Sequence, residues 1–153
     1  MPPDWITRFP ELGKLTAAEQ KLIAERAQVV ELPARTTVFA PGLPAESFLL
    51  VLEGTVRVQQ VSAGGREIVL YRVTGGESCI MTTACLLSQD IYNAEGVTET
   101  PVTAVAVPKA AFDDLMARSA EFRRFVFADY SSRITDLLHV VEEVAFERID
   151  KRL

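Results

Sequence analysis

Residues 75–87 read GGESCIMTTACLL, and residues 92–95 read YNAE. The Gly75-Gly76-Glu77 run follows a β-rich stretch, and paired glycines are typical of a tight turn because they adopt backbone angles that other residues avoid. The small residues after this run predict a short turn, and the end of the segment predicts a return strand. The segment also contains both cysteines of the chain, Cys79 and Cys85. It therefore predicts a β domain with a turn that carries small polar and thiol side chains.

The sequence around this segment, from residue 29 to residue 108, alternates short β-rich runs with turn signals. Such regular spacing argues for a small closed or sandwich-like β domain. Gly54 and the Gly64-Gly65 pair are expected to form hairpin turns between consecutive strands. The predicted strands are residues 29–32, 37–39, 47–52, 55–60, 67–73, 77–80, 93–98 and 103–108.

Helical patterns flank the β region on both sides. Thr16 stands three residues before Glu19, which is the spacing of a capping box and predicts a helix over residues 17–28. A short helix is predicted over residues 110–118. A long helix of about 28 residues, or about 42 Å, is predicted over residues 121–148.

The apolar residues of the long helix recur at alternating spacings of three and four, which is typical of a helix that pairs with a partner helix. They are Phe127, Tyr130, Ile134, Leu137, Val141 and Val144. We therefore expect a homodimer formed through this helix. The chain then divides into a sensor domain, residues 1–118, and a dimerisation helix with the start of a hinge, residues 119–153.

The composition of the chain argues against several classes of function. The chain has 153 residues, 48% of them hydrophobic, and a net charge of −5, so no basic surface for nucleic acid is expected. The single histidine, His139, almost excludes a histidine-based metal site and disfavours a Ser-His-Asp triad, so we expect neither a metal site nor an enzyme. No run approaches the roughly 18 apolar residues of a membrane span, and the N-terminus lacks the pattern of a signal peptide. These features predict a cytoplasmic protein without a membrane partner.

The order of helix, eight strands, short helix and long helix resembles the sensory domain of the Crp/Fnr transcription regulators. The residues that carry the resemblance are LEGTVRV at 52–58, Gly76-Glu77, Ala94, Val107-Pro108 ahead of Phe112, and VAFERIDKRL at 144–153. The resemblance implies an α+β fold that is mainly β, a double-stranded β-helix or jelly roll with an N-terminal helix and a long C-terminal dimerisation helix. It also implies a winged-helix domain after residue 153, so that DNA would be bound only by a domain outside this chain.

The same resemblance makes residues 76–94 the ligand cassette. Members that bind cyclic AMP use a glutamate for the ribose and an Arg-Ser or Arg-Thr pair for the phosphate. Here Met81-Thr82-Thr83 and Tyr92-Asn93 hold those places, and neither can neutralise a buried phosphate. Leu137 and Leu138 hold the helix positions that would meet the base. We therefore expect tight cyclic AMP binding to be absent.

Two signals remain open for this sensor. A small organic effector would use candidate residues in the cassette and the long helix, namely Gly76, Glu77, Ser78, Thr82, Thr83, Tyr92, Asn93, Leu137 and Leu138. A redox signal would use Cys79 and Cys85, which are six residues apart on a segment expected to turn back, so that their thiols would come within disulfide range. An iron–sulfur cluster is disfavoured because the N-terminus has no cysteine. Haem would need axial ligands, for which His139, Cys79, Cys85 and Pro2 are the candidates, and it is disfavoured because His139 is expected at the surface or the dimer interface.

Two other functions are alternatives to this interpretation. A cyclic-nucleotide-binding regulatory module unconnected to transcription would share the β-roll and its cassette. A cupin-like enzyme would also be a β-barrel, but it needs about three histidine or carboxylate metal ligands on facing strands. The single histidine disfavours this second alternative.

Overall fold

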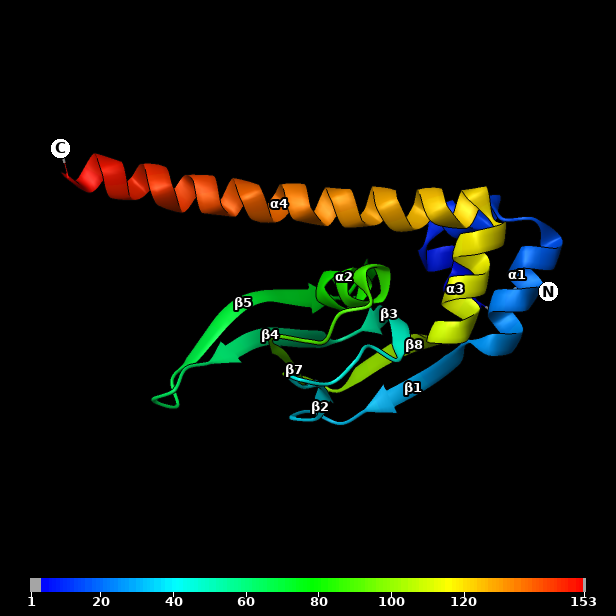
Figure 1. Ribbon diagram of the computed structural model, residues 1–153, viewed down its shortest axis with the longest axis horizontal. Coiled ribbons are helices and arrows are strands. Elements are labelled where there is room, and N and C mark those ends of the chain that lie inside the picture. Colours follow the sequence, from blue (N-terminus) through cyan, green and yellow to red (C-terminus); the bar gives the residue numbers. More distant parts are fainter. Residues whose placement is uncertain (1–3, 153) are drawn as a thin grey trace.

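The computed structural model describes residues 4–152, with side chains described as far as residue 147, and shows a β-roll covered by helices at one end (Figure 1). Its strands form two four-stranded antiparallel sheets, with the orders β1-β8-β3-β6 and β2-β7-β4-β5. The strands are β1 (Gln28–Leu32), β2 (Thr37–Phe39), β3 (Ser47–Glu53), β4 (Thr55–Val61), β5 (Glu67–Thr74), β6 (Glu77–Ser78), β7 (Glu95–Thr98) and β8 (Val102–Pro108). The predicted jelly roll is confirmed, and all eight predicted strands are present.

One of the two expected hairpins is wrong. The Gly64-Gly65 turn does connect a hairpin, because β4 pairs with β5 along its length. Gly54, however, connects β3 to β4, which belong to different sheets. It has a φ of +91°, and a Cβ at this position would lie 2.2 Å from the carbonyl oxygen of Pro101. Gly54 is therefore required for a close backbone crossing between the sheets.

The helices surround one end of the roll. They are η1 (Asp4–Arg8), η2 (Pro10–Lys14), α1 (Ala17–Arg26), α2 (Ile80–Ser88), α3 (Lys109–Arg118) and α4 (Ala120–Arg152), of which η1 and η2 are 3₁₀ helices. The capping box of α1 is confirmed, because the backbone N–H of Glu19 donates to Thr16 Oγ1 at 3.2 Å and that of Thr16 donates to Glu19 Oε1 at 2.9 Å. The 33 residues of α4 span about 50 Å, which is longer than predicted.

The segment that was expected to be a turn and a strand contains the helix α2. The strand β6 ends at Ser78, and the helix begins two residues later at Ile80. Thr83 fixes the first turn, since its backbone N–H and its hydroxyl both donate to the carbonyl oxygen of Cys79, at 3.0 and 3.1 Å. Residues 80–88 contain neither glycine nor proline, so nothing in the backbone opposes a helix.

The core contains buried residues of both sheets and of the helices, and its phenylalanine cluster lies between the β1-β8-β3-β6 sheet and the helices. Phe48 on β3 is 1% exposed, and its ring centroid lies 5.2 Å from that of Phe112, 6.1 Å from that of Phe122 and 6.3 Å from that of Phe125. This phenylalanine cluster fixes α3 and the first half of α4 on the sheet.

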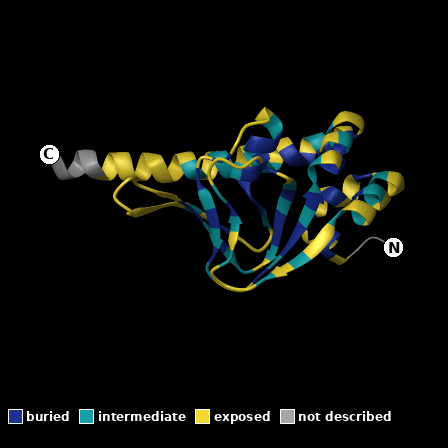
Figure 2. Cartoon of the chain, turned by 60° about the horizontal axis from the view of Figure 1, so that its bottom comes forward, coloured by how far each residue is buried: buried dark blue, intermediate teal, exposed yellow. Residues whose placement is uncertain are grey.

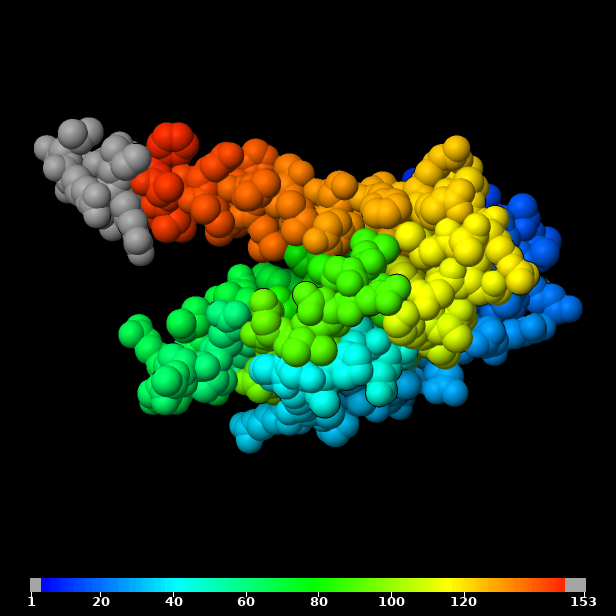
Figure 3. Space-filling view, viewed as in Figure 1, coloured from blue at the N-terminus to red at the C-terminus, as the bar shows by residue number. Residues whose placement is uncertain are grey.

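The described residues of the chain leave the second half of α4 exposed. Every side chain from Leu138 to Glu147 is exposed (Figure 2). In the space-filling view this half stands apart from the β4–β5 hairpin (Figure 3). Among the described helices, α4 included, none is long and apolar enough to cross a membrane.

Candidate functional site

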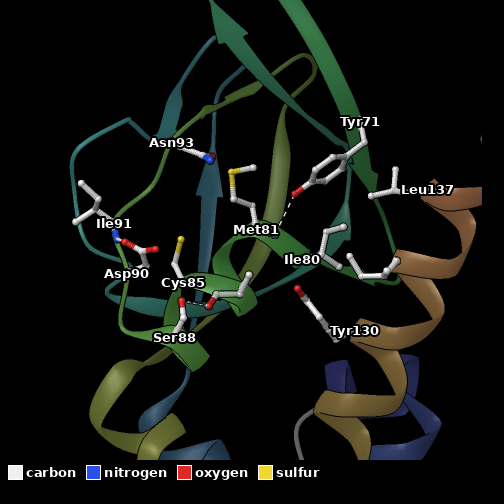
Figure 4. A pocket seen from close by; sticks show the side chains of 12 residues that line it. Tyr71, Ile80, Met81, Cys85, Ser88, Asp90, Ile91, Asn93, Tyr130 and Leu137 are labelled. Atoms are coloured by element: carbon white, nitrogen blue, oxygen red, sulfur yellow. Dashed lines mark hydrogen bonds between the residues drawn. The ribbon is translucent and has the colours of Figure 1, made fainter. Parts of the chain in front are cut away.

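A cavity of about 320 Å³ lies between α2 and the middle of α4, with β5 at its side (Figure 4). Residues of β5, α2, the loop after α2 and α4 line it. They are Tyr71, Ile80, Met81, Ala84, Cys85, Ser88, Asp90, Ile91, Asn93, Tyr130, Ile134 and Leu137. Its volume is within the usual range for small-molecule sites.

The helix periodicity of α2 explains which of its residues reach the cavity. Met81, Ala84, Cys85 and Ser88 follow the i, i+3, i+4, i+7 spacing of a single helix face. The opposite face, which carries Thr82, is buried against the roll.

The cavity is apolar where α4 meets β5. Tyr130, Ile134 and Leu137 share one face of α4 and are half-buried. Opposite them, the Tyr71 hydroxyl accepts the backbone N–H of Met81 at 3.0 Å, which fixes the phenol ring against the start of α2. Burial raises the pKa of Tyr71 well above its ordinary value, so the phenol stays neutral.

The other end of the cavity is polar. Figure 4 shows Ser88, Asp90 and Asn93 on the side away from α4. The Asp90 carboxylate accepts the backbone N–H of Ile91 at 2.8 Å. No arginine or lysine is among the described residues that line this cavity, and Asp90 carries its one formal charge. A buried phosphate needs a cation and several donors, so this lining is poorly suited to one.

A second, smaller cavity of about 110 Å³ adjoins the first and shares Tyr71, Ile80 and Leu137 with it. Beside it lies a group of polar side chains that we call the α4 clamp, namely Glu77, Ser78, Asp129 and Arg133. Arg133 donates to Glu77 at 2.6 Å, and the Ser78 hydroxyl donates to Asp129. The clamp therefore joins β6 to the middle of α4 through an ion pair and a hydrogen bond.

The backbone and the side chain of Thr74, at the end of β5, hold the Glu77 carboxylate of the clamp in place. Glu77 accepts the backbone N–H of Thr74 at 2.7 Å and the Thr74 hydroxyl at 2.8 Å. Arg133 Nε lies 3.9 Å from Asp129 Oδ1 and has no hydrogen-bond partner among the described residues, although it is buried. A shift of α4 along its axis would break these contacts.

The clamp should contribute more to stability than an ordinary surface ion pair, because Glu77 and Arg133 are only 26% and 29% exposed. We expect Arg133→Met to lower the free energy of unfolding by about 1.5–3 kcal/mol. A double-mutant cycle with Glu77→Gln in urea unfolding should give a coupling energy of more than about 1 kcal/mol.

Arg118→Met is the matched control for this prediction. Arg118 pairs with Asp114 at 2.9 Å, but its side chain is 78% exposed, so its loss should cost less than about 1 kcal/mol. A Glu77–Arg133 coupling no larger than that of this surface pair would show that the clamp does not hold α4.

The structure brings few of the predicted effector residues together. Of the nine, only Asn93 and Leu137 line the main cavity. Glu77 and Ser78 line the smaller cavity, Gly76 lines a separate hollow beside η1, and Tyr92 lines another inside the roll.

The remaining three predicted effector residues do not line any of these cavities. Thr82 and Thr83 are 0% and 2% exposed, because α2 turns them into the core. Leu138 is 56% exposed and lies outside the cavity lining. The cassette is helical rather than a loop, and this difference moves the site onto a different set of side chains.

The two cysteines are free, and the expected approach of their thiols is wrong. Cys79 holds the position just before α2 and Cys85 lies near the end of this helix, so a rise of six residues separates them by about 9 Å, beyond the disulfide range. Burial raises the pKa of both thiols, and the charge of Asp90 adds to this for Cys85, so both stay protonated at neutral pH. Of the two cysteines, only Cys85 lines the cavity between α2 and α4. A redox role for the cysteines stays a prediction.

The residues of the predicted dimer seam fall into two groups. Tyr130, Ile134 and Leu137 are half-buried along the cavity. Phe127, Val141 and Val144 are 49%, 62% and 46% exposed, so the described part of the chain leaves about half of each residue uncovered. The pattern correctly indicated one apolar face, but this chain itself covers the middle of that face.

Sequence reasoning missed several residues that form the site. Tyr71 lies on a strand and Ile80 at the start of a helix, and the sequence alone does not show which way either side chain points. Arg133 is not among the site residues that the sequence predicts. The spacing of Asp129 and Arg133, four residues apart, was the available signal, because it places both on one face of the long helix. In the described part of the chain, no group of three or more His, Cys, Asp or Glu residues is placed to hold a metal.

Comparisons with known proteins agree with this architecture. A family model described as the cyclic nucleotide-binding domain matches residues 29–119. The global nitrogen regulator of Synechococcus elongatus is 28% identical over 97% of this chain. The chain spans 63% of the length of that relative.

Solved structures show the same fold. A transcriptional regulator of the Crp/Fnr family from Eubacterium rectale aligns with a TM-score of 0.81 at 23% identity, covering 95% of this chain and 68% of that one. The sensor domain of the transcriptional regulator DNR from Pseudomonas aeruginosa aligns with a TM-score of 0.71 at 16% identity, covering 88% of this chain and 89% of that one. The chain belongs to the cyclic nucleotide-binding domain family, and its fold is that of the Crp/Fnr transcription regulators.

Proposed function

We propose that this chain is the effector-sensing and dimerisation part of a Crp/Fnr-like transcription regulator. The observation that carries the proposal is the cavity of about 320 Å³ between α2 and α4. One wall is the cassette of the β-roll, and the other is the helix α4, whose second half is exposed and carries the apolar side chains Leu138, Val141 and Val144. A ligand in this cavity touches both, so its binding energy can favour one position of α4 over another.

The effector is a small organic molecule other than a cyclic nucleotide. The walls at the α4 end are apolar, and the polar end offers a carboxylate, an amide and a hydroxyl from Asp90, Asn93 and Ser88. An anionic phosphate placed here would face Asp90, and the arginines of the adjoining cavity, Arg72 and Arg133, are already paired with Glu99 and Glu77.

The output passes along α4. The α4 clamp and the phenylalanine cluster hold the first half of the helix on the roll, and the second half pairs with the same helix of another copy. In this proposal DNA is bound by a domain outside this chain, which is supported by the description of one structural neighbour as a transcriptional regulator.

Cyclic AMP and cyclic GMP should not bind. Isothermal titration calorimetry with either nucleotide should show no saturable heat at concentrations up to about 1 mM, where a Kd corresponds to only about 4 kcal/mol. Binding in the micromolar range would contradict the assignment of the lining and favour a cyclic-nucleotide module.

The effector site itself can be tested with a cavity-filling variant. A thermal-shift screen of small metabolites should yield compounds that stabilise the wild type and the Ala18→Trp variant, whose substitution is on the exposed face of α1. The same compounds should not stabilise Leu137→Trp, in which the larger side chain fills the cavity. Stabilisation that persists in Leu137→Trp would place the effector elsewhere.

A further inference from the structure

A further cavity lies between the two sheets of the β-roll rather than under α4, and it opens at a rim that contains the exposed residues Leu43, Pro44 and Glu46. It measures about 260 Å³ and is lined by residues of both sheets. Val38 and Phe39 come from β2, Ser47 and Leu49 from β3, and Ala106 from β8. Leu49 and Ala106 are directly paired across the sheet.

The alternation of side chains along β3 explains why its large side chains do not fill this cavity. Phe48 and Leu50 are fully buried, and Phe48 contacts the phenylalanines of α3 and α4. Successive side chains point to opposite faces of a strand, so Ser47 and Leu49 point away from those helices, toward the other sheet. The large side chains of β3 thus pack against the helices, and the inner face carries smaller or half-buried ones.

Aromatic and charged groups define the chemistry of this cavity. The rings of Phe39 and Tyr92 stack with centroids 4.2 Å apart and planes 11° from parallel. Glu46 is exposed at the rim and is the one residue with a formal charge among the described residues of the lining. A stacked aromatic wall suits an aromatic guest, and a carboxylate at the rim suits a guest with a hydrogen-bond donor.

Tyr92 connects this cavity to the site under α4. Its ring lines the cavity, and its hydroxyl is hydrogen-bonded to Thr82 Oγ1 at 2.9 Å. Thr82 is 0% exposed and lies on the buried face of α2, opposite the face that lines the first cavity. A guest that moves the Tyr92 ring would therefore move α2.

We propose that the cavity inside the roll is a second small-molecule site, which takes a small aromatic compound with an N–H donor and transmits its occupancy to α2 through the Tyr92–Thr82 hydrogen bond. The site is separate from the one under α4 and does not rest on the function proposed for that one. Anionic aromatic compounds are disfavoured, because Glu46 would repel them.

Indole is a suitable probe, and benzofuran is its isostere without the N–H donor. In NMR titrations of the chain, indole should shift the methyl signals of Val38, Leu49 and Ala106 saturably, and benzofuran should bind at least about fivefold more weakly. Glu46→Gln should reduce this difference. Saturable indole shifts confined to Met81 and Leu137, or none at all, would overturn the site.

Cavity-filling variants separate this site from the other. Ala106→Leu should weaken indole binding at least about tenfold, and Leu137→Trp should leave it unchanged. Val38→Phe serves the same purpose if Ala106→Leu does not fold. Indole binding that survives in folded cavity-filling variants would refute the assignment.

The coupling to α2 has its own test. In the wild type, indole should also shift the backbone amides of Met81 and Ala84. Tyr92→Phe keeps the ring and removes the hydroxyl, so it should still bind indole but lose most of these α2 shifts. Equal α2 shifts in both proteins would overturn the coupling.

Discussion

Phe48→Ala should lower the free energy of unfolding by about 3–5 kcal/mol, the largest stability effect expected for a single side chain here. Phe48 is 1% exposed and lies in edge-to-face or tilted contact with Phe112, Phe122 and Phe125. Removing the ring leaves a cavity that rigid neighbours cannot fill, and it also removes aromatic contacts of α3 and α4. Urea unfolding followed by far-UV circular dichroism measures the loss.

The same variant should loosen the connection between sensor and output. Hydrogen exchange of backbone amides in the first half of α4 should become faster, because the cluster fixes this half on the sheet. Phe146→Ala is the matched control, since Phe146 is on the same helix but 66% exposed, and it should change stability by less than about 0.5 kcal/mol. A loss of less than about 1.5 kcal/mol for Phe48→Ala would show that the cluster is not the anchor of α4.

The strands could be predicted closely from the sequence, because alternation and turn residues are local signals. The predicted strand 37–39 matches β2, and 103–108 differs from β8 by one residue. The pairing of strands could not be predicted as well. A glycine between two strands is compatible with a hairpin or with a crossing to another sheet, and Gly54 does the second.

The helix α2 was missed for an energetic reason. Residues 80–88 mix strong helix formers, namely Met81, Ala84, Leu86 and Leu87, with isoleucine, threonine and cysteine, whose helix propensity is modest, so propensity alone does not decide between a helix and a strand. Burial of Thr82, Thr83 and Leu86 against the roll supplies the preference, and that depends on the tertiary structure. Because the site is one face of this helix, the error in secondary structure became an error in the site residues.

Periodicity showed that one face of α4 is apolar but not what covers it. Ile134 and Leu137 contribute to the cavity, and Val141, on the same face, is exposed. The Glu77–Arg133 ion pair joins residues 56 positions apart, and no spacing rule connects them. Contacts of this kind depend on the tertiary fold, so local sequence patterns cannot predict them.

Val141→Glu should raise the dimer dissociation constant by at least about 100-fold, or about 2.7 kcal/mol, if the second half of α4 is the dimer contact. Leu138, Val141 and Val144 are 56%, 62% and 46% exposed, and each is an apolar side chain on the half of α4 that the described residues leave exposed. Pairing of two such helices would bury Val141, and a carboxylate in its place would lose its hydration without gaining a cation. Sedimentation equilibrium over a range of concentrations measures the change.

Ser132→Glu is the matched control, because it adds the same charge to the same helix on the opposite face. Nine residues separate Ser132 from Val141, which at 3.6 residues per turn is about two and a half turns. Ser132 is exposed, so its substitution should leave the dissociation constant within about threefold of the wild type. If both variants weaken the dimer equally, the effect is general charge repulsion between copies. If neither variant weakens the dimer, the dimer contact lies outside the apolar face of α4. The signal proposed to pass along α4 would then have to pass through another part of the protein.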